Sequence, residues 1–250
     1  MEFLDSFINT YPILTGVICV GIIVVSMIYT LRLYRGIVIS NGKDGFRDSL
    51  TPTQKFILAA SSPTTANNYK CVIDIWGTCE SEGDREKAIK LFEWSWGEFT
   101  CENVRMSVDG CLNHGYHEKF KEYCKAGEPS SSASGYTDFE RELLEETKRK
   151  YPKQGLLGWD LVRILSIVGG AYMGGVMEYG EAVRIAFETC KLLQEKFSSW
   201  DDMVGSYTLG YQLWRGKRKK DRLKYYKRLK RSSWIYRSAP WDTVLKEEEL

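Results

Sequence analysis

Residues 158–182, GWDLVRILSIVGGAYMGGVMEYGEA, decide the fold of this chain. The neutral run inside this stretch extends from Ile164 to Met177 and is 14 residues long, bounded by Arg163 and Glu178. A helix needs about 20 apolar residues to cross the hydrocarbon core of a bilayer, so this run is too short for a membrane span. It predicts a helix in the buried core of a helical domain.

Four glycines at 169, 170, 174 and 175 interrupt this predicted helix. Each glycine costs a helix about 0.8 to 1 kcal/mol relative to alanine. We expect close approach of a neighbouring helix to offset that cost. The apolar stripe of the helix is Trp159, Leu161, Ile164, Leu165 and Val168.

Asp160 and Arg163 are three residues apart at the start of the same helix, where an ion pair between them is geometrically feasible. One interpretation makes Arg163 a clamp for a phosphate or carboxylate, with Asp160 orienting it. The favoured interpretation is a partly buried structural ion pair beside Trp159.

Further helices are predicted on both sides of this stretch. Thr51, Pro52 and Gln54 form a helix start with a capping box, and Pro63 is expected to limit that helix. Thr137 and Glu140 form a second capping box. Helical periodicity also marks residues 84–96, 101–113 and 181–197.

No segment sustains the period of two that is typical of a strand, so the predicted fold class is all-α. We predict one helical globular domain over residues 49–214, divided by a Ser/Gly-rich surface loop at 126–137.

Several motifs together resemble one known family. They are a Trp-Asp-x-x-Arg helix start, a Ser-Trp-acidic motif and a Tyr-x-x-Gly helix ending in an aromatic residue. The matching positions are Trp159, Asp160, Arg163, Ala182, Ser199, Trp200, Asp201, Tyr207, Gly210 and Trp214, with Trp96, Gly97, Gly115 and Phe120 upstream. Over residues 50 to 214 the chain resembles the bacterial domain-of-unknown-function 1266 family. Tyr116 and His117 stand where that family has His and Arg. The resemblance implies a helical bacterial domain and supplies no mechanism.

The seven cysteines are scattered without a CxxC pair, which favours free thiols in a reducing compartment. The two histidines, His114 and His117, lie between Cys111 and Cys124, but their spacing is not typical of a zinc site. We interpret them as surface histidines and expect no metal ion and no cofactor. The sequence contains no P-loop, dinucleotide-binding fingerprint, HExxH or GxSxG motif, so no catalytic residue is predicted.

The amino-terminal segment, residues 1–33, predicts a single transmembrane helix at about 13–31. Those 19 residues carry no charge, and as a helix they span about 28 Å, close to the thickness of a bilayer core. Basic residues follow the span and none precedes it, so the positive-inside rule places the amino terminus outside and the rest of the chain in the cytoplasm. Residues 34–48 are predicted to be a short tether.

The carboxyl-terminal segment, residues 215–250, is predicted to be a basic amphipathic tail. Leu223, Tyr226 and Leu229 follow one another at three-residue steps among basic side chains. Contact with anionic lipid is the favoured interpretation, a solvated charged end comes second and nucleic acid third. The predicted contact residues are Lys217, Arg218, Lys219, Lys220, Arg222, Lys224, Lys227, Arg228, Lys230 and Arg231.

The sequence favours a membrane-anchored cytoplasmic domain that binds another protein. An enzyme acting on an anionic substrate near Asp160 and Arg163 is the second hypothesis, and a toxin-neutralising or stress-related factor is the third. The predicted binding residues are Trp159, Asp160, Arg163, Trp200 and Tyr207.

Overall fold

A computed structural model describes residues 20–28, 49–69, 82–126, 135–232 and 234–250. The chain divides into two compact units, Met1–Ser40 and Asn41–Leu250. In the first unit, residues 20–28 are helical and expose apolar side chains. None of the helices in the described ranges has the length and apolar character that a membrane crossing requires. Residues 13–19 and 29–31 of the predicted span, and the whole of the predicted tether, residues 34–48, lie outside the described residues.

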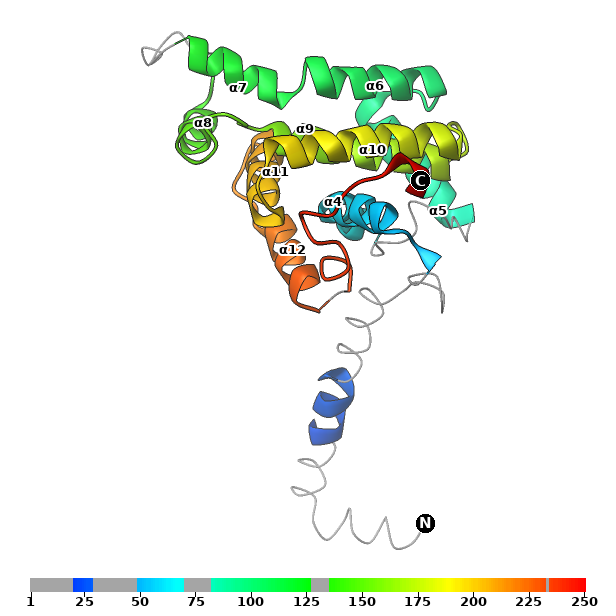
Figure 1. Cartoon of the computed structure of the whole chain (residues 1–250). Helices are drawn as coiled ribbons and strands as arrows, with labels where there is room; N and C mark the ends of the chain where they lie inside the picture. The colour runs from blue at the N-terminus through cyan, green and yellow to red at the C-terminus, as the bar shows by residue number, and fades with distance from the viewer. Residues whose placement is uncertain (1–19, 29–48, 70–81, 127–134, 233) are drawn as a thin grey trace, which may run out of the picture. The chain divides into compact units, whose positions relative to one another are not determined.

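The second unit is built from helices alone within the residues described, which confirms the all-α fold class (Figure 1). The bounds are α4 Pro52–Tyr69, α5 Glu82–Trp96, α6 Cys101–Asn113, α7 Tyr116–Lys125, α8 Asp138–Lys150, α9 Leu157–Met173, α10 Tyr179–Lys196, α11 Trp200–Arg215, α12 Asp221–Ser232 and a 3-10 turn Glu247–Glu249. The predicted capping boxes at Thr51 and Thr137 are both formed.

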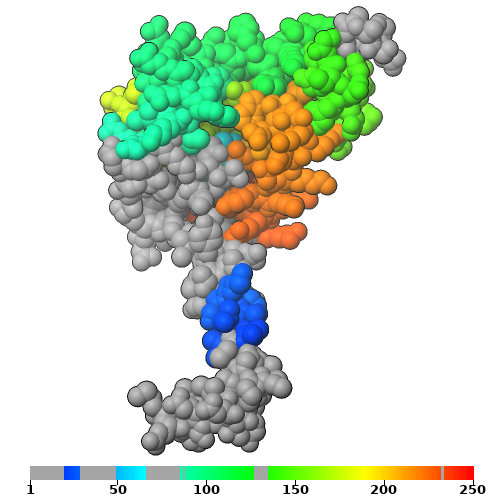
Figure 2. All heavy atoms as spheres, turned by 180° about the vertical axis from the view of Figure 1, so that it is seen from behind, coloured from blue at the N-terminus to red at the C-terminus, as the bar shows by residue number. Residues whose placement is uncertain are grey.

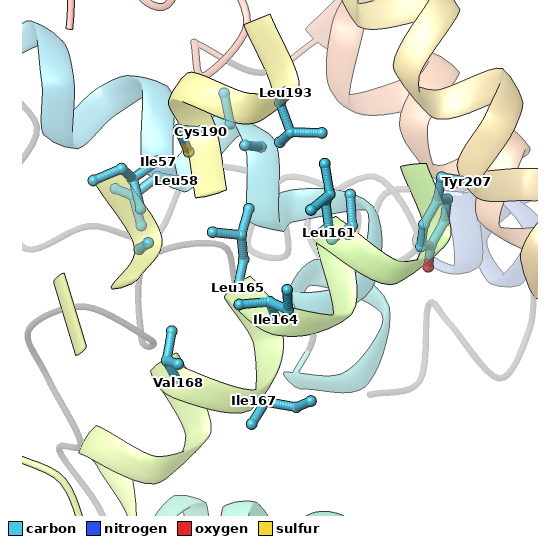
Figure 3. Packing of buried hydrophobic residues seen from close by; sticks show 14 of the residues in the cluster. Ile57, Leu58, Leu161, Ile164, Leu165, Ile167, Val168, Cys190, Leu193 and Tyr207 are labelled. Atoms are coloured by element: carbon cyan, nitrogen blue, oxygen red, sulfur yellow. The ribbon is translucent and has the colours of Figure 1, made fainter. Parts of the chain in front are cut away.

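Helix α9 is the centre of the domain, as the sequence predicts. It packs against α4, α5, α6, α7, α10 and α11, and α10 runs alongside it in Figure 1. Leu161, Ile164, Leu165 and Val168 are fully buried, and Figure 3 shows them among side chains of α4 and α10. A helix that is apolar on all sides is stable only inside a core, so the remaining helices assemble around α9.

Close approach between α9 and α11 occurs at Gly158 and Gly210, which are not among the four glycines for which it is expected. A Cβ at Gly158 would lie 2.7 Å from the Met203 carbonyl oxygen, and one at Gly210 would collide with the Trp159 side chain. Of the four expected glycines, a Cβ at Gly174 would collide with the Phe99 ring, and one at Gly175 would lie 2.9 Å from Arg85 Nη2. The stretch 158–182 is also not one helix, because α9 ends at Met173. Gly174 caps its carboxyl end, and Gly175 follows with φ of +79°.

Pro63 does not limit its helix, contrary to the prediction, because α4 continues to Tyr69. A proline in a helix removes the N–H that would bond the carbonyl four residues earlier, here that of Ala59. The Ser62 hydroxyl donates a hydrogen bond to this oxygen at 2.9 Å. The side chain thus satisfies the acceptor that proline leaves open.

The segment after residue 214 is not a separate tail, which corrects the predicted domain boundary. Helix α12 packs on α4 and α11, and its Tyr226 and Leu229 are buried. Ile235, Tyr236 and Ala239 beyond it are buried in the same core. The apolar stripe predicted to meet lipid covers α4 and α11 instead.

Candidate ligand-binding site

A cavity of about 570 Å³ opens among α5, α9 and α11, with contributions from α4 and α12. Four tryptophans line it, Trp94, Trp96, Trp159 and Trp214, of which Trp94 is 70% exposed. Figure 2 shows the face on which α5, in teal, meets α11, in orange, and the Trp94 and Trp214 ring centroids lie 5.9 Å apart. Ligand sites are typically concave and aromatic, with volumes of about 300 to 1,000 Å³.

Two of the predicted binding residues, Trp159 and Arg163, line this cavity, and Arg163 supplies a positive charge to it. Its guanidinium carbon lies 4.4 Å from the ring centre of Trp96 and 5.2 Å from that of Trp159. Stacking between aromatic faces holds a guanidinium in one orientation. The side chain is 19% exposed, so it remains accessible from the cavity.

Asp160 lies behind Arg163 and is completely buried. Its Oδ1 is 3.7 Å from the Arg163 guanidinium, so the predicted ion pair is present. Its Oδ2 accepts a hydrogen bond from the His117 backbone N–H at 2.8 Å and lies 2.9 Å from His117 Nδ1. The structure therefore contains the structural ion pair of the favoured interpretation, and its arginine lines a cavity.

His117 is buried, which corrects its interpretation as a surface histidine. The acidic partner was invisible in the sequence because it lies 43 residues away, on another helix. Cys111 also lies in this neighbourhood, and burial raises the pKa of its thiol to about 12. No cluster of His, Cys, Asp and Glu among the described residues is arranged to hold a metal ion.

Trp159 and Tyr207 form the base of the cavity region, and both are buried. Their ring centroids are 5.4 Å apart, and the Tyr207 hydroxyl lies 3.0 Å from Thr64 Oγ1. Trp159 lines the cavity, whereas Tyr207 supports it from behind. Within the described part of the chain, the buried indole N–H of Trp159 has no hydrogen-bond partner.

Trp200 lies apart from this site. Its ring packs against Phe56 and Trp241, and its indole N–H donates to the Ala239 carbonyl at 2.9 Å. It packs the carboxyl-terminal segment against the core and does not line the cavity.

Two further arginines line the cavity: Arg215 was not predicted as a site residue, and Arg222 was predicted only as a lipid or polyanion contact. Arg215 is exposed at the end of α11, with its guanidinium 5.4 Å from the Trp214 ring centre. Arg222 comes from α12, is 8% exposed, and donates to the Thr64 carbonyl at 2.9 Å. The sequence signal that points to them is the aromatic and basic run at residues 211–222.

The ten basic residues predicted to meet lipid or a polyanion differ in environment. Arg222 is buried in the cavity region, which corrects its assignment to a surface. Arg218 is paired with Glu142 and Glu146, and Lys230 is paired with Asp201. Arg218 and Lys230 are exposed, and so are Lys217, Lys220, Lys224, Lys227 and Arg231, whereas Lys219 and Arg228 are half-buried.

Comparison with known families places this chain. Neither the curated proteins nor the solved structures contain a match to it. A family model described as protein of unknown function (DUF1266) matches residues 83–244, which confirms the resemblance and extends it through α12. Because this match covers more than half of the chain, the protein belongs to the DUF1266 family.

Proposed function

We propose that the helical domain binds an anionic ligand in the cavity among α5, α9 and α11. The observation that carries this proposal is the charge of the lining: it contains Arg163, Arg215 and Arg222, and no Asp or Glu among the described residues. A cavity lined by one sign of charge concentrates ions of the opposite sign. The aromatic walls exclude water, which strengthens each interaction with an anion.

Binding is a better description than catalysis for this site. The hydroxyls of Ser95 and Ser166 line the cavity, but the described lining residues include no His, Cys, Asp or Glu that could act as a base to activate them. Asp160 is separated from the cavity by Arg163, so it positions the arginine and does not face a ligand. The protein partner expected from the sequence stays a prediction.

A panel of small carboxylates, sulfates and phosphates, with neutral compounds of the same shape, tests the proposal on the full chain in lipid nanodiscs. We expect anions to raise the melting temperature and neutral compounds to leave it unchanged, because a ligand stabilises the state that binds it. Arg215→Gln is expected to weaken binding about tenfold, the effect of one lost charge-assisted hydrogen bond. Arg149→Gln, an exposed residue of α8, is the matched control. Equal responses to anions and neutral compounds would contradict the proposal.

We also propose that residues 13–31 anchor the chain in a bilayer, with the amino terminus outside and the helical domain in the cytoplasm. The support is the uncharged 19-residue run and the basic residues that follow it. The exposed basic face of α12 is then expected to lie against anionic lipid, through charge alone, because its apolar face is buried. Release of the intact chain from membranes by alkaline carbonate would contradict the anchor.

A further inference from the structure

Three aromatic rings form one cluster at the wall of the cavity. The ring centroid of Trp159 lies 5.8 Å from that of Tyr211 and 5.7 Å from that of Trp214. The Tyr211 and Trp214 centroids are 6.1 Å apart, so each ring touches both others. Residues from α9 and α11 build this cluster, and all three line the cavity.

Each ring of this cluster carries one arginine. The guanidinium carbon of Arg163 lies 5.2 Å from the Trp159 ring centre, and that of Arg222 lies 5.1 Å from the Tyr211 ring centre. Arg215 lies 5.4 Å from the ring centre of Trp214. The three arginines come from α9, α12 and α11, and the cluster gathers their guanidinium groups around a single cavity.

Two of these guanidinium groups are fixed before any ligand arrives. Arg163 is held by the buried Asp160 carboxylate and lies against the ring of Trp96. Arg222 is held by the carbonyl oxygens of Pro63 and Thr64, at 3.3 and 2.9 Å. Fixed donors bind an anion with little loss of side-chain entropy. Arg215 is exposed, so it is the group that a ligand meets first.

Several of the remaining lining groups are hydrogen-bond donors. The indole N–H of Trp159, which is 5% exposed, has no partner among the described residues, and the hydroxyls of Ser95 and Ser166 line the same cavity. A carboxylate offers two oxygens in one plane, whereas a phosphoryl group offers three oxygens in different directions. Three guanidinium groups and an indole N–H therefore match a phosphoryl group better.

We infer that the ligand is a phosphomonoester carried on a flat aromatic group, an assignment that rests on the anion binding proposed above. Arg163, Arg215 and Arg222 bind the phosphoryl oxygens, and the tryptophan walls of the cavity stack on the flat body. Asp160 is a positioning residue, since it touches Arg163 and not the ligand. A lipid headgroup with a terminal phosphate shares the phosphoryl chemistry but lacks the flat body, so the inference assigns the cavity to a soluble compound.

Tryptophan fluorescence of the full chain, in nanodiscs of neutral phosphatidylcholine, tests this inference with phenyl phosphate, phenyl sulfate and inorganic phosphate. We expect saturable binding of phenyl phosphate, at least about tenfold tighter than binding of either other probe, because sulfate carries one charge fewer and inorganic phosphate lacks the flat body. Arg163→Gln and Arg215→Gln should each weaken phenyl phosphate about tenfold, and Arg149→Gln should leave it unchanged. If Arg163→Gln fails to fold, the exposed Arg215→Gln carries the test.

Nanodiscs that contain phosphatidate test whether a lipid headgroup with a terminal phosphate, which lacks the flat body, occupies the cavity and so overturns the inference. If the lipid headgroup occupies the cavity, phenyl phosphate will bind about tenfold more weakly in them than in neutral nanodiscs. Unchanged affinity assigns the phosphomonoester to a soluble compound.

Two further results would overturn the inference. If phenyl sulfate binds as tightly as phenyl phosphate, the phosphoryl assignment is wrong while anion binding stands. If phenyl phosphate gives no saturable signal, or if both arginine variants bind it as tightly as the parent chain does, the cavity does not bind phosphomonoesters. The wider anion panel then decides separately whether it binds anions.

Discussion

Asp160 shows how much depends on a single buried charge. Its carboxylate accepts the His117 backbone N–H, lies beside the His117 ring and holds Arg163. Removing one partner of such a group leaves the others without compensation in a medium where water cannot replace it. The geometry of the cavity and the stability of the domain are therefore coupled at this residue.

Asp160→Asn is expected to lower the free energy of unfolding by about 2 kcal/mol, because the amide cannot balance the Arg163 charge. Urea denaturation of the full chain measures this change. Asp242→Asn, at an exposed position, is the control and should change stability by less than about 0.5 kcal/mol. Equal stability of the two variants would show that the buried carboxylate is not structural.

Gly115 and Gly110 make a matched pair of glycine positions. A Cβ at Gly115 would lie 2.5 Å from Asp160 Cγ, whereas a Cβ at Gly110, inside α6, meets nothing within 4 Å. Gly115→Ala should destabilise the domain by about 1 to 3 kcal/mol through overpacking. Gly110→Ala should stabilise it by up to about 1 kcal/mol, as expected for alanine in a helix interior. Thermal unfolding monitored by circular dichroism distinguishes the two, and shifts of the same sign would refute the packing described.

At the scale of helices, α12 is the element whose environment the sequence did not reveal. Its stripe of Leu223, Tyr226 and Leu229 among basic residues satisfies the pattern of a lipid-surface helix and that of a core helix equally. The partner decides between them, and the partner here is α4, more than 150 residues away. Periodicity alone identifies the buried face but not what covers it.

Leu229→Ala tests this packing, because the side chain is completely buried. The substitution should cost about 2 to 4 kcal/mol of unfolding free energy, the usual result of deleting a buried leucine side chain. Lys227→Ala, on the exposed face of the same helix, should be nearly neutral. A neutral Leu229→Ala, measured by urea denaturation, would restore the separate tail.

Local signals predicted the elements better than the candidate site. The capping boxes at Thr51 and Thr137 and the central helix with its buried stripe follow from residues that are neighbours in sequence. The prediction that Pro63 limits its helix was wrong because the Ser62 hydroxyl satisfies the Ala59 carbonyl. That hydrogen bond depends on the orientation of the serine side chain, which helix propensities do not describe. Asp160 and Arg163 were found through their spacing on one helix. Trp94, Trp214 and Arg215 were missed, and Arg222 was assigned to a lipid or polyanion surface, because only tertiary packing brings α5, α11 and α12 to one cavity.

At the scale of the whole domain, the last residues close onto the beginning of α4. Thr53 donates to Glu249 Oε2 from its backbone N–H at 3.0 Å and from its hydroxyl at 2.7 Å. The Thr51 hydroxyl donates to the Glu249 carbonyl at 2.7 Å. A carboxylate at a helix amino terminus is stabilised by the free N–H groups there. This contact joins the first and last helical segments of the described domain.

The hydrogen bonds from Thr53 hold the pKa of Glu249 below its ordinary value of 4.5. A carboxyl with a depressed folded-state pKa adds stability above its unfolded-state pKa and loses that contribution as pH falls through the folded-state value. Glu249→Gln should therefore melt at a lower temperature than the parent chain near neutral pH, and the difference should shrink below pH 4.5. Thermal melts across this range measure it, and a difference independent of pH would refute the charged contact.

Because Cys111 and Cys190 are buried, the rate at which their thiols are labelled reports how often the surrounding helices open. Both thiols are at most 1% exposed, and burial raises the pKa of each, so neither reacts while the helices stay packed. Thiol reagents attack the thiolate, and each labelling event at these positions reports one transient separation of helices from the core. The alkylation rate of Cys111, followed by mass spectrometry, therefore counts how often the wall behind Arg163 comes apart. The alkylation rate of Cys190 reports in the same way how often α10 separates from the core.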